Sequence, residues 1–359
     1  GIYWIQTTFV QLFSSIKKDD AKVNNILKDN IWKYRFTSSL GGLISILIIY
    51  FLTQNLFGRK TAFYSALILA SGLLFIIESH IAKTDAFLLT VSILVMALLA
   101  GYYTGYYTKK KDFRFFLLWF AVSISILIKG PVLPLIMLMT IIALVILNRD
   151  YNWLKNTQPF LGLIIIISIN IPWFLFMPAE QFNNFFYEGI KQDFFGKLVK
   201  AQESHNAFFG AHFLSLWVLF FPMSFFLIPL FYSLKKSYKN KKVTFLLAWI
   251  LPSFFVFELV PTKLPHYTLP LYPAISILMG HLISEKKENY FFNYISYIGF
   301  LLYFIAGLAI VVFLTLGVLK FGIFNNYFLS LSIILSILIL LGILLVFKTE
   351  IVVVFYYKV

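Results

Sequence analysis

The sequence predicts an all-α integral membrane protein, a polytopic bundle of about eleven transmembrane helices with interfacial helices at its N-terminus. The first observation is composition: the 359 residues are 60% hydrophobic and 19% aromatic, and only 13% are charged. Soluble domains carry about 25% charged residues to cover their surface, so this chain must expose much of its outside to lipid. The second is that apolar runs of roughly 20 residues recur, the length that crosses a bilayer core as a helix.

Residues 1–36 differ from the rest of the chain, because short apolar runs alternate there with Lys, Arg and Asp residues. This pattern predicts amphipathic helices that lie in the membrane interface, with a soluble cap as the alternative. The chain opens on Gly1 and the apolar stretch Ile2-Tyr-Trp-Ile5, without the basic region of a signal peptide. We therefore expect an internal start, with a first helix and loop upstream.

The transmembrane segments follow from the length rule, since helices satisfy their own backbone polar groups in lipid. They are predicted at 38–56, 61–79, 86–107, 113–128, 131–147, 159–177, 211–233, 243–258, 266–283, 291–316 and 327–347. The last two spans carry almost no polar residues. We accordingly divide the chain into a functional core, residues 1–285, and C-terminal scaffold helices, residues 286–359.

The distribution of positive charge predicts the orientation. Alternate connections carry sixteen Lys and Arg residues, whereas the opposite connections carry seven. Cytoplasmic loops hold the excess in membrane proteins, so the first set is expected in the cytoplasm. The net charge of +15 then reflects topology, and no nucleic-acid partner is expected. The longest connection on the other side, residues 178–210, is predicted to be a periplasmic loop that folds over a site.

The chain has no cysteine. This excludes disulfide frameworks, thiolate zinc sites and cysteine nucleophiles.

The candidate functional residues are ionisable groups at membrane depth, where each one is costly and therefore suggests function. They gather on the non-cytoplasmic side: Glu78, His80, Lys83, Asp85, Lys129, Glu203, His205, His212, Glu258, Lys263 and His266. Lys and His can hold a phosphate through charge-assisted hydrogen bonds, and Asp and Glu can accept a proton or bind a divalent cation. This set indicates a transferase with a phosphate leaving group.

Each candidate also has a structural interpretation. Lys83 and Lys263 are at helix ends, where a lysine can extend its ammonium toward the headgroups. Glu203 and His205 have a spacing that also occurs by chance, so the spacing of these two residues alone is weak evidence for a divalent metal site.

Several segments read together resemble the aminoarabinose transferase and protein mannosyltransferase family, of the GT-C class. The resemblance covers residues 1 to about 285. It is carried by Leu56-Phe-Gly-Arg-Lys-Thr-Ala62, Ser79-His-Ile-Ala-Lys-Thr-Asp85, Lys129-Gly-Pro131, Pro172-Trp-Phe174, Gln202-Glu-Ser-His205, Thr262-Lys-Leu-Pro-His-Tyr267 and Leu269-Pro-Leu-Tyr-Pro273. The Thr262–Tyr267 segment is the strongest piece.

The resemblance implies an inverting glycosyltransferase of the bacterial inner membrane. It would take a sugar from a polyprenyl-phosphate donor and pass it to lipid A or a related glycolipid at the periplasmic face, while cations stabilise the leaving phosphate. The family's main catalytic Asp lies in a first periplasmic loop, which we expect upstream of Gly1.

Carried over residue by residue, the resemblance makes Asp85 the catalytic residue of this stretch. Lys83, Lys263, His266 and Tyr267 would contact the donor, and Glu203 and His205 would hold a divalent metal cation, if one is used. Three alternatives stay open: a protein hydroxyl as acceptor, a flippase or transporter for a lipid-linked sugar, and a non-catalytic remnant. The absence of an internal repeat and the one-sided gathering of ionisable residues favour the transferase.

Overall fold

The protein is a bundle of helices in the computed structural model, which describes residues 2–13, 31–107, 112–176, 178, 207–285 and 294–321, and isolated positions from 330 to 341. The α-helices are α1 (Ile2–Phe13), α3 (Trp32–Phe57), α4 (Arg59–Ser71), α5 (Leu73–His80), α6 (Asp85–Thr104), α7 (Phe113–Lys129), α8 (Val132–Asn148), α9 (Pro159–Leu175), α12 (Ala211–Leu219), α13 (Leu227–Ser237), α14 (Lys241–Leu259), α15 (Tyr272–Ser284) and α16 (Tyr294–Phe321). Short 3₁₀ turns are η2 (Asn152–Thr157), η4 (Met223–Phe226) and η5 (Pro265–Leu271).

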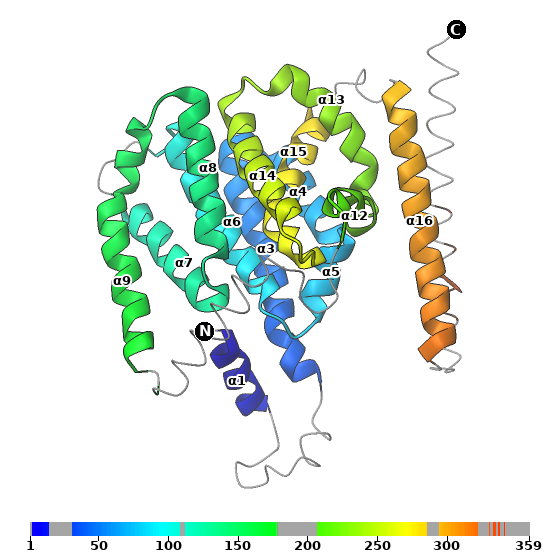
Figure 1. Cartoon of the computed structure of the whole chain (residues 1–359), viewed down its shortest axis with the longest axis horizontal. Coiled ribbons are helices and arrows are strands. Elements are labelled where there is room, and N and C mark those ends of the chain that lie inside the picture. The colour runs from blue at the N-terminus through cyan, green and yellow to red at the C-terminus, as the bar shows by residue number, and fades with distance from the viewer. Residues whose placement is uncertain are drawn as a thin grey trace.

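The centre of the bundle is built from α3, α4, α6 and α15 (Figure 1). Small residues bring these helices together: a Cβ at Gly280 of α15 would lie 2.6 Å from the Ser65 hydroxyl oxygen of α4, and one at Gly41 of α3 would lie 2.9 Å from the Phe87 ring of α6. In lipid the hydrophobic effect does not drive helices together, so van der Waals contact between closely approaching helices stabilises the packing instead. Around this centre α14 packs on α8, α7 packs on α9, and α16 lies along α12 and α13.

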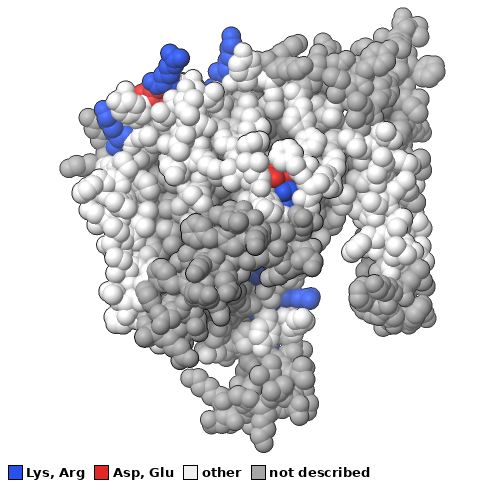
Figure 2. Space-filling model, in the orientation of Figure 1, with Lys and Arg blue, Asp and Glu red and all other residues white. Residues whose placement is uncertain are grey.

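The outer surface is apolar. Large hydrophobic side chains face outward along many helices, among them Leu138, Ile146, Phe160 and Phe313, which are 51–77% exposed. Figure 2 shows a broad uncharged face, with Lys and Arg side chains projecting at the upper end of the view. A water-soluble protein rarely exposes so much apolar area, so the chain is a multi-pass integral membrane protein.

The count of eleven spans is wrong for the structure. In the ranges described, three helices are long and apolar enough to cross a membrane, α3, α6 and α14, and a fourth span results if α4 and α5 count as one. The helices α8 and α9 have 17 residues each, or about 26 Å, which is short of the hydrocarbon core. The predicted span 327–347 lies almost wholly outside the described residues.

Interruptions of the helices explain why fewer spans are present than predicted, because the hydropathy of a segment does not show them. The predicted span 61–79 bends by 64° at Gly72, between α4 and α5. The span predicted at 211–233 is divided into α12, η4 and α13, and the one at 266–283 into η5 and α15. In both cases proline, which cannot donate a backbone hydrogen bond, stands in the break: Pro222 in the first and Pro270 in the second.

The N-terminal region also differs from the prediction. A helix is present at Ile2–Phe13, but α3 already begins at Trp32, so the last residues of the predicted interfacial region 1–36 belong to a spanning helix. The helix α1 packs on α3, and Gln6 Nε2 donates to the Tyr34 carbonyl oxygen at 2.9 Å. The predicted loop 178–210 lies mostly outside the described residues.

Candidate functional site

The candidate site is centred on the α5–α6 junction, which we define as residues 78–85. Helix α5 ends at His80, and α6 begins at Asp85. The first turns of α3 hold the intervening backbone: Ser38 Oγ donates to the Lys83 carbonyl oxygen at 2.9 Å, and Ser39 Oγ donates to the Ser79 carbonyl oxygen at 2.9 Å. Two serines therefore fix a segment that has no helical hydrogen bonds of its own, and with it the side chains of Lys83 and Asp85.

Asp85 forms an ion pair with Lys129. The Lys129 ammonium donates to Asp85 Oδ1, and Asp85 is only 4% exposed. The two charges also suit their helices, since Asp85 is in the first turn of α6 and Lys129 is the last residue of α7; helix ends favour an acid at the start and a base at the end. Removing one partner of a buried pair leaves the other charge uncompensated, so the pair must be treated as a unit.

Glu78 is the second buried carboxylate of the junction, 4% exposed. Its Oε1 lies 3.8 Å from Lys83 Nζ and 4.0 Å from His266 Nδ1. Its Oε2 has no hydrogen-bond partner in the part of the chain that the structure describes. Glu78 also interacts electrostatically with Asp85 and Lys129. The junction therefore places two carboxylates and two lysines together, with one carboxylate oxygen left to accept a hydrogen bond.

A third carboxylate, Glu258, is used differently. It lies in the last turn of α14 and accepts backbone hydrogen bonds from Gly210 N at 3.0 Å and Phe213 N at 2.8 Å, at the start of α12. These amides have no partner within their own helix, so Glu258 caps α12 from another element. Lys263 Nζ donates to the carbonyl oxygens of Glu258 and Val260, each at 2.8 Å, at the end of α14.

The structure brings together some of the predicted residues. Lys83, Asp85 and His266 all surround Glu78, and Tyr267 stacks edge-on against His266 with 5.1 Å between ring centroids. Lys263 has its ammonium on the end of α14. Glu203 and His205 lie outside the described residues, and within those residues no group of three or more His, Asp or Glu side chains is placed to hold a metal ion.

Comparison with known proteins tests the predicted resemblance. The sequence model of the family described as dolichyl-phosphate-mannose-protein mannosyltransferase matches residues 21–176. The match includes α3 to α9, and with them the α5–α6 junction and Lys129.

Solved structures show the same fold. Two crystal structures of ArnT from Cupriavidus metallidurans, one bound to undecaprenyl phosphate and one in the apo state, match with TM-scores of 0.70 and 0.71. Each match covers 95% of this chain and 60% or 59% of ArnT, at 18% and 19% sequence identity. The chain therefore has an ArnT-like helical fold.

Curated relatives are also known from sequence. Two uncharacterized proteins of Aquifex aeolicus (strain VF5) are 29% and 27% identical to this chain over 261 and 256 residues. The matches cover 70% and 71% of this chain but 49% and 56% of the relatives, so the chain spans about half the length of the curated relatives it matches.

Proposed function

We propose that the chain forms the membrane core of a glycosyltransferase that takes a sugar from a polyprenyl-phosphate donor and passes it to an acceptor of the cell envelope. The observation that carries this proposal is the α5–α6 junction, where Asp85, Glu78, Lys83 and Lys129 lie at one end of the bundle. The family match and the ArnT-like fold support it. ArnT itself was crystallised with undecaprenyl phosphate, which makes a polyprenyl phosphate the natural donor to test.

The proposed reaction is an inverting substitution at the anomeric carbon. The bond between this carbon and the phosphate oxygen of the carrier breaks, and its electron pair leaves with the phosphate. The acceptor hydroxyl oxygen bonds to the anomeric carbon from the opposite side and loses its proton to a carboxylate. Negative charge grows on the phosphate as the bond breaks, and nearby cations stabilise that charge most strongly in the transition state.

The junction supplies groups for each part of this reaction. We assign the catalytic carboxylate of this stretch to Asp85, which Lys129 holds in place. Lys83, with a side chain 44% exposed, can reach the donor phosphate, and Lys263 has one N–H left for it after donating to two carbonyls. The free oxygen of Glu78 can accept a hydrogen bond from a sugar hydroxyl or amine, while His266 and Tyr267 border the same space.

The finer assignments follow the same proposal. We place the junction on the periplasmic face of a bacterial inner membrane, because the positive-inside rule puts the Lys-rich connections on the other side. Residues 1–285 would form the transferase core, and residues 286–359 the C-terminal scaffold. Lipid A or a related glycolipid is the leading acceptor. A protein hydroxyl is the second candidate, favoured by the description of the matching family.

The experiment is sugar transfer from a polyprenyl-phosphate donor to lipid A in membranes of cells that express the chain from its complete gene. We expect transfer to fall about 100-fold or more in Asp85→Asn, the usual contribution of a proton-accepting side chain. Asp150→Asn is the matched control, because Asp150 is an exposed aspartate bonded to Asn152 in the turn before η2.

Folding must be separated from chemistry in this test. Asp85→Asn leaves Lys129 without its counter-charge, which costs about 3–5 kcal/mol at a buried site. The double variant Asp85→Asn with Lys129→Met removes both charges, so we expect it to recover stability without recovering transfer. Transfer by the double variant at the level of the intact chain contradicts the role of Asp85. If the intact chain transfers no sugar but moves the donor lipid to the other leaflet, the protein is a transporter.

A further inference from the structure

The end of α5 lies against α3 at a close contact made by Gly42. Helices α3 and α5 pack on each other, and a Cβ added to Gly42 would lie 2.5 Å from the Ser79 hydroxyl oxygen and 2.9 Å from Ser79 Cβ. Real Cβ atoms essentially never approach a neighbouring atom within 3.0 Å. A residue larger than glycine at position 42 would therefore push Ser79 away from α3.

Hydrogen bonds from α3 hold the same stretch of backbone. Ser39 Oγ donates to the Ser79 carbonyl oxygen at 2.9 Å, while Ser38 Oγ donates to the Lys83 carbonyl oxygen at 2.9 Å and lies 3.3 Å from Lys83 N. Residues three and four apart are neighbours on a helix surface, so positions 38, 39 and 42 share one face of α3. This face, which we call the α3 seat, fixes the backbone at two points of the α5–α6 junction.

The α3 seat determines where Glu78 can lie, because Glu78 directly precedes Ser79. Glu78 Oε1 is 3.8 Å from Lys83 Nζ and 4.0 Å from His266 Nδ1, beyond the length of a direct hydrogen bond, about 2.7–3.2 Å. Its Oε2 has no hydrogen-bond partner among the described residues. A shift of about 1 Å would bring Oε1 to hydrogen-bond distance of either neighbour. A buried acceptor without a donor is costly, so the carboxylate stays in this position only if the backbone beside it is held.

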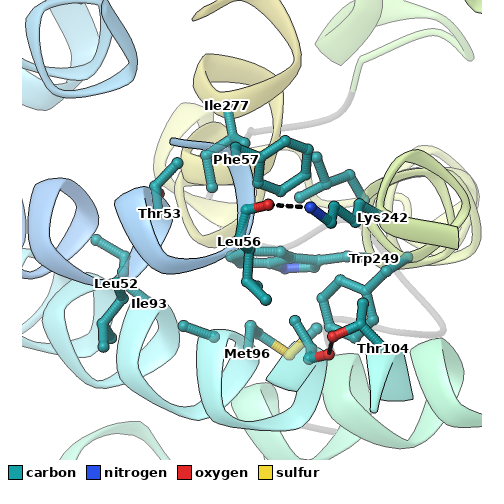
Figure 3. Close-up of a pocket in the computed structure, with 14 residues that line it drawn as sticks. Leu52, Thr53, Leu56, Phe57, Ile93, Met96, Thr104, Lys242, Trp249 and Ile277 are labelled. Carbon is teal, nitrogen blue, oxygen red and sulfur yellow. Dashed lines mark hydrogen bonds between the residues drawn. The ribbon is translucent and has the colours of Figure 1, made fainter. Parts of the chain in front are cut away.

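The other end of α3 lacks such a seat. About 21 Å along the helix from Gly42, Leu56 and Phe57 line an apolar cavity with Met96 of α6 and Trp249 of α14 (Figure 3). The cavity has a volume of about 30 Å³, far below the size of a substrate site. Changes at this end can loosen the packing of α3 without moving the junction, so they provide a control on the same helix.

We propose that the α3 seat is a positioning element of the transferase, which keeps Glu78 out of direct hydrogen bonds with Lys83 and His266 and so leaves its carboxylate available to the donor sugar. This inference rests on the proposed function. The residues of the seat do not touch substrate: they act through the backbone of Ser79 and Lys83. Close packing alone would stabilise the bundle, whereas positioning also predicts that a change at Gly42 is felt at Glu78.

The test measures the transfer reaction described above, with rates normalised to the amount of protein that elutes as a folded species in size-exclusion chromatography. We expect Gly42→Ala to lower transfer about 10- to 100-fold, because a misplacement of about 1 Å can cost that much. Ser39→Ala, which loses one hydrogen bond to the Ser79 carbonyl oxygen, should lower transfer several-fold. The double variant Gly42→Ala, Ser79→Gly restores the space between the helices and should recover most of the transfer, with Ser79→Gly alone as its reference.

A coupling measurement distinguishes positioning from packing. In the Glu78→Gln background, Gly42→Ala should have little further effect, because two changes that act through the same group are not additive. Gly280→Ala inserts the same methyl group between α15 and α4, 2.6 Å from the Ser65 hydroxyl oxygen, and Leu56→Ala loosens α3 at the cavity. Both control variants should lower the melting temperature and leave the KM for the donor unchanged.

The possible outcomes separate this inference from the proposed function. If Gly42→Ala loses stability like Gly280→Ala but keeps the KM for the donor, the contact is only structural and the inference is wrong. An equal loss of transfer with and without Glu78 contradicts it as well. If Gly42→Ala does not fold, Ser39→Ala is compared with the same controls and decides the question. If the intact chain transfers no sugar, the proposed function fails and this inference fails with it.

Discussion

Two buried glutamates lie in the group of ionisable residues that the sequence singles out, and the structure uses them differently. Glu78 at the α5–α6 junction and Glu258 at the end of α14 are 4% and 5% exposed. Both oxygens of Glu258 accept backbone N–H groups at the start of α12. Glu78 instead has the Lys83 ammonium at 3.8 Å and the His266 ring nitrogen at 4.0 Å, and one of its oxygens has no hydrogen-bond partner among the described residues. Both residues are functional candidates because they are ionisable groups at membrane depth. What distinguishes the structural carboxylate from the candidate functional one is whether all of its oxygens have hydrogen-bond partners within the protein.

The difference has a physical cause in the neighbouring elements. Gly210 has φ +98°, a left-handed conformation, and directs its N–H to Glu258 at the start of α12. A residue with a side chain is strained in this conformation, so glycine makes the cap possible. Glu78 has no backbone donor of this kind among the described residues: its Oε1 lies near Lys83 and His266, and its Oε2 has no hydrogen-bond partner. Glu78 is therefore left to interact with side chains.

The largest effect should come from Glu258→Ala, as a loss of stability. The substitution removes two charge-assisted hydrogen bonds, each with a net contribution of about 1.5–3 kcal/mol, and uncaps α12. We expect the apparent melting temperature of the purified protein in detergent to fall clearly, and Glu258→Gln, which keeps one acceptor oxygen, to fall about half as far. An unchanged melting temperature in Glu258→Ala contradicts the capping role.

Glu78→Gln should instead change function. The amide keeps the shape of the side chain and removes a buried charge, so we expect the melting temperature to stay within a few degrees of the original. Sugar transfer should fall about tenfold, with the change mainly in the KM for the donor, because a hydrogen bond to a charged acceptor is replaced by one to a neutral acceptor.

Glu285→Gln is the matched control for this measurement. It removes a carboxylate that also faces a histidine, at the other end of α15, and we expect transfer to be unaffected. If Glu78→Gln destabilises the protein as strongly as Glu258→Ala while the KM is unchanged, both glutamates are structural and the comparison fails.

The sequence was sufficient for the all-helical membrane fold and for the resemblance to the mannosyltransferase family, and several of the ionisable residues that it singles out do lie together in the structure. The hydropathy of a segment does not show where a helix ends and another begins, as happens at Gly72 between α4 and α5. The number of spans was therefore overestimated. The motif spacing also gave no reason to pair Asp85 with Lys129, 44 residues away, because such a contact depends on how α6 and α7 pack. A lysine at the end of one helix and an aspartate at the start of another was the available signal.

The smallest expected effects concern Lys83 and Lys263, two lysines at helix ends that the sequence alone does not distinguish. Lys263 donates to two carbonyl oxygens at the end of α14, whereas the Lys83 side chain is 44% exposed and lies beside Glu78. We expect Lys83→Met to raise the KM for the donor several-fold with little change in melting temperature. Lys263→Met removes two hydrogen bonds and should lower stability by about 2 kcal/mol, at about 1 kcal/mol for each, and it should raise the KM less than Lys83→Met does. The reverse order of the two KM values would assign the donor phosphate to the end of α14 and not to the α5–α6 junction.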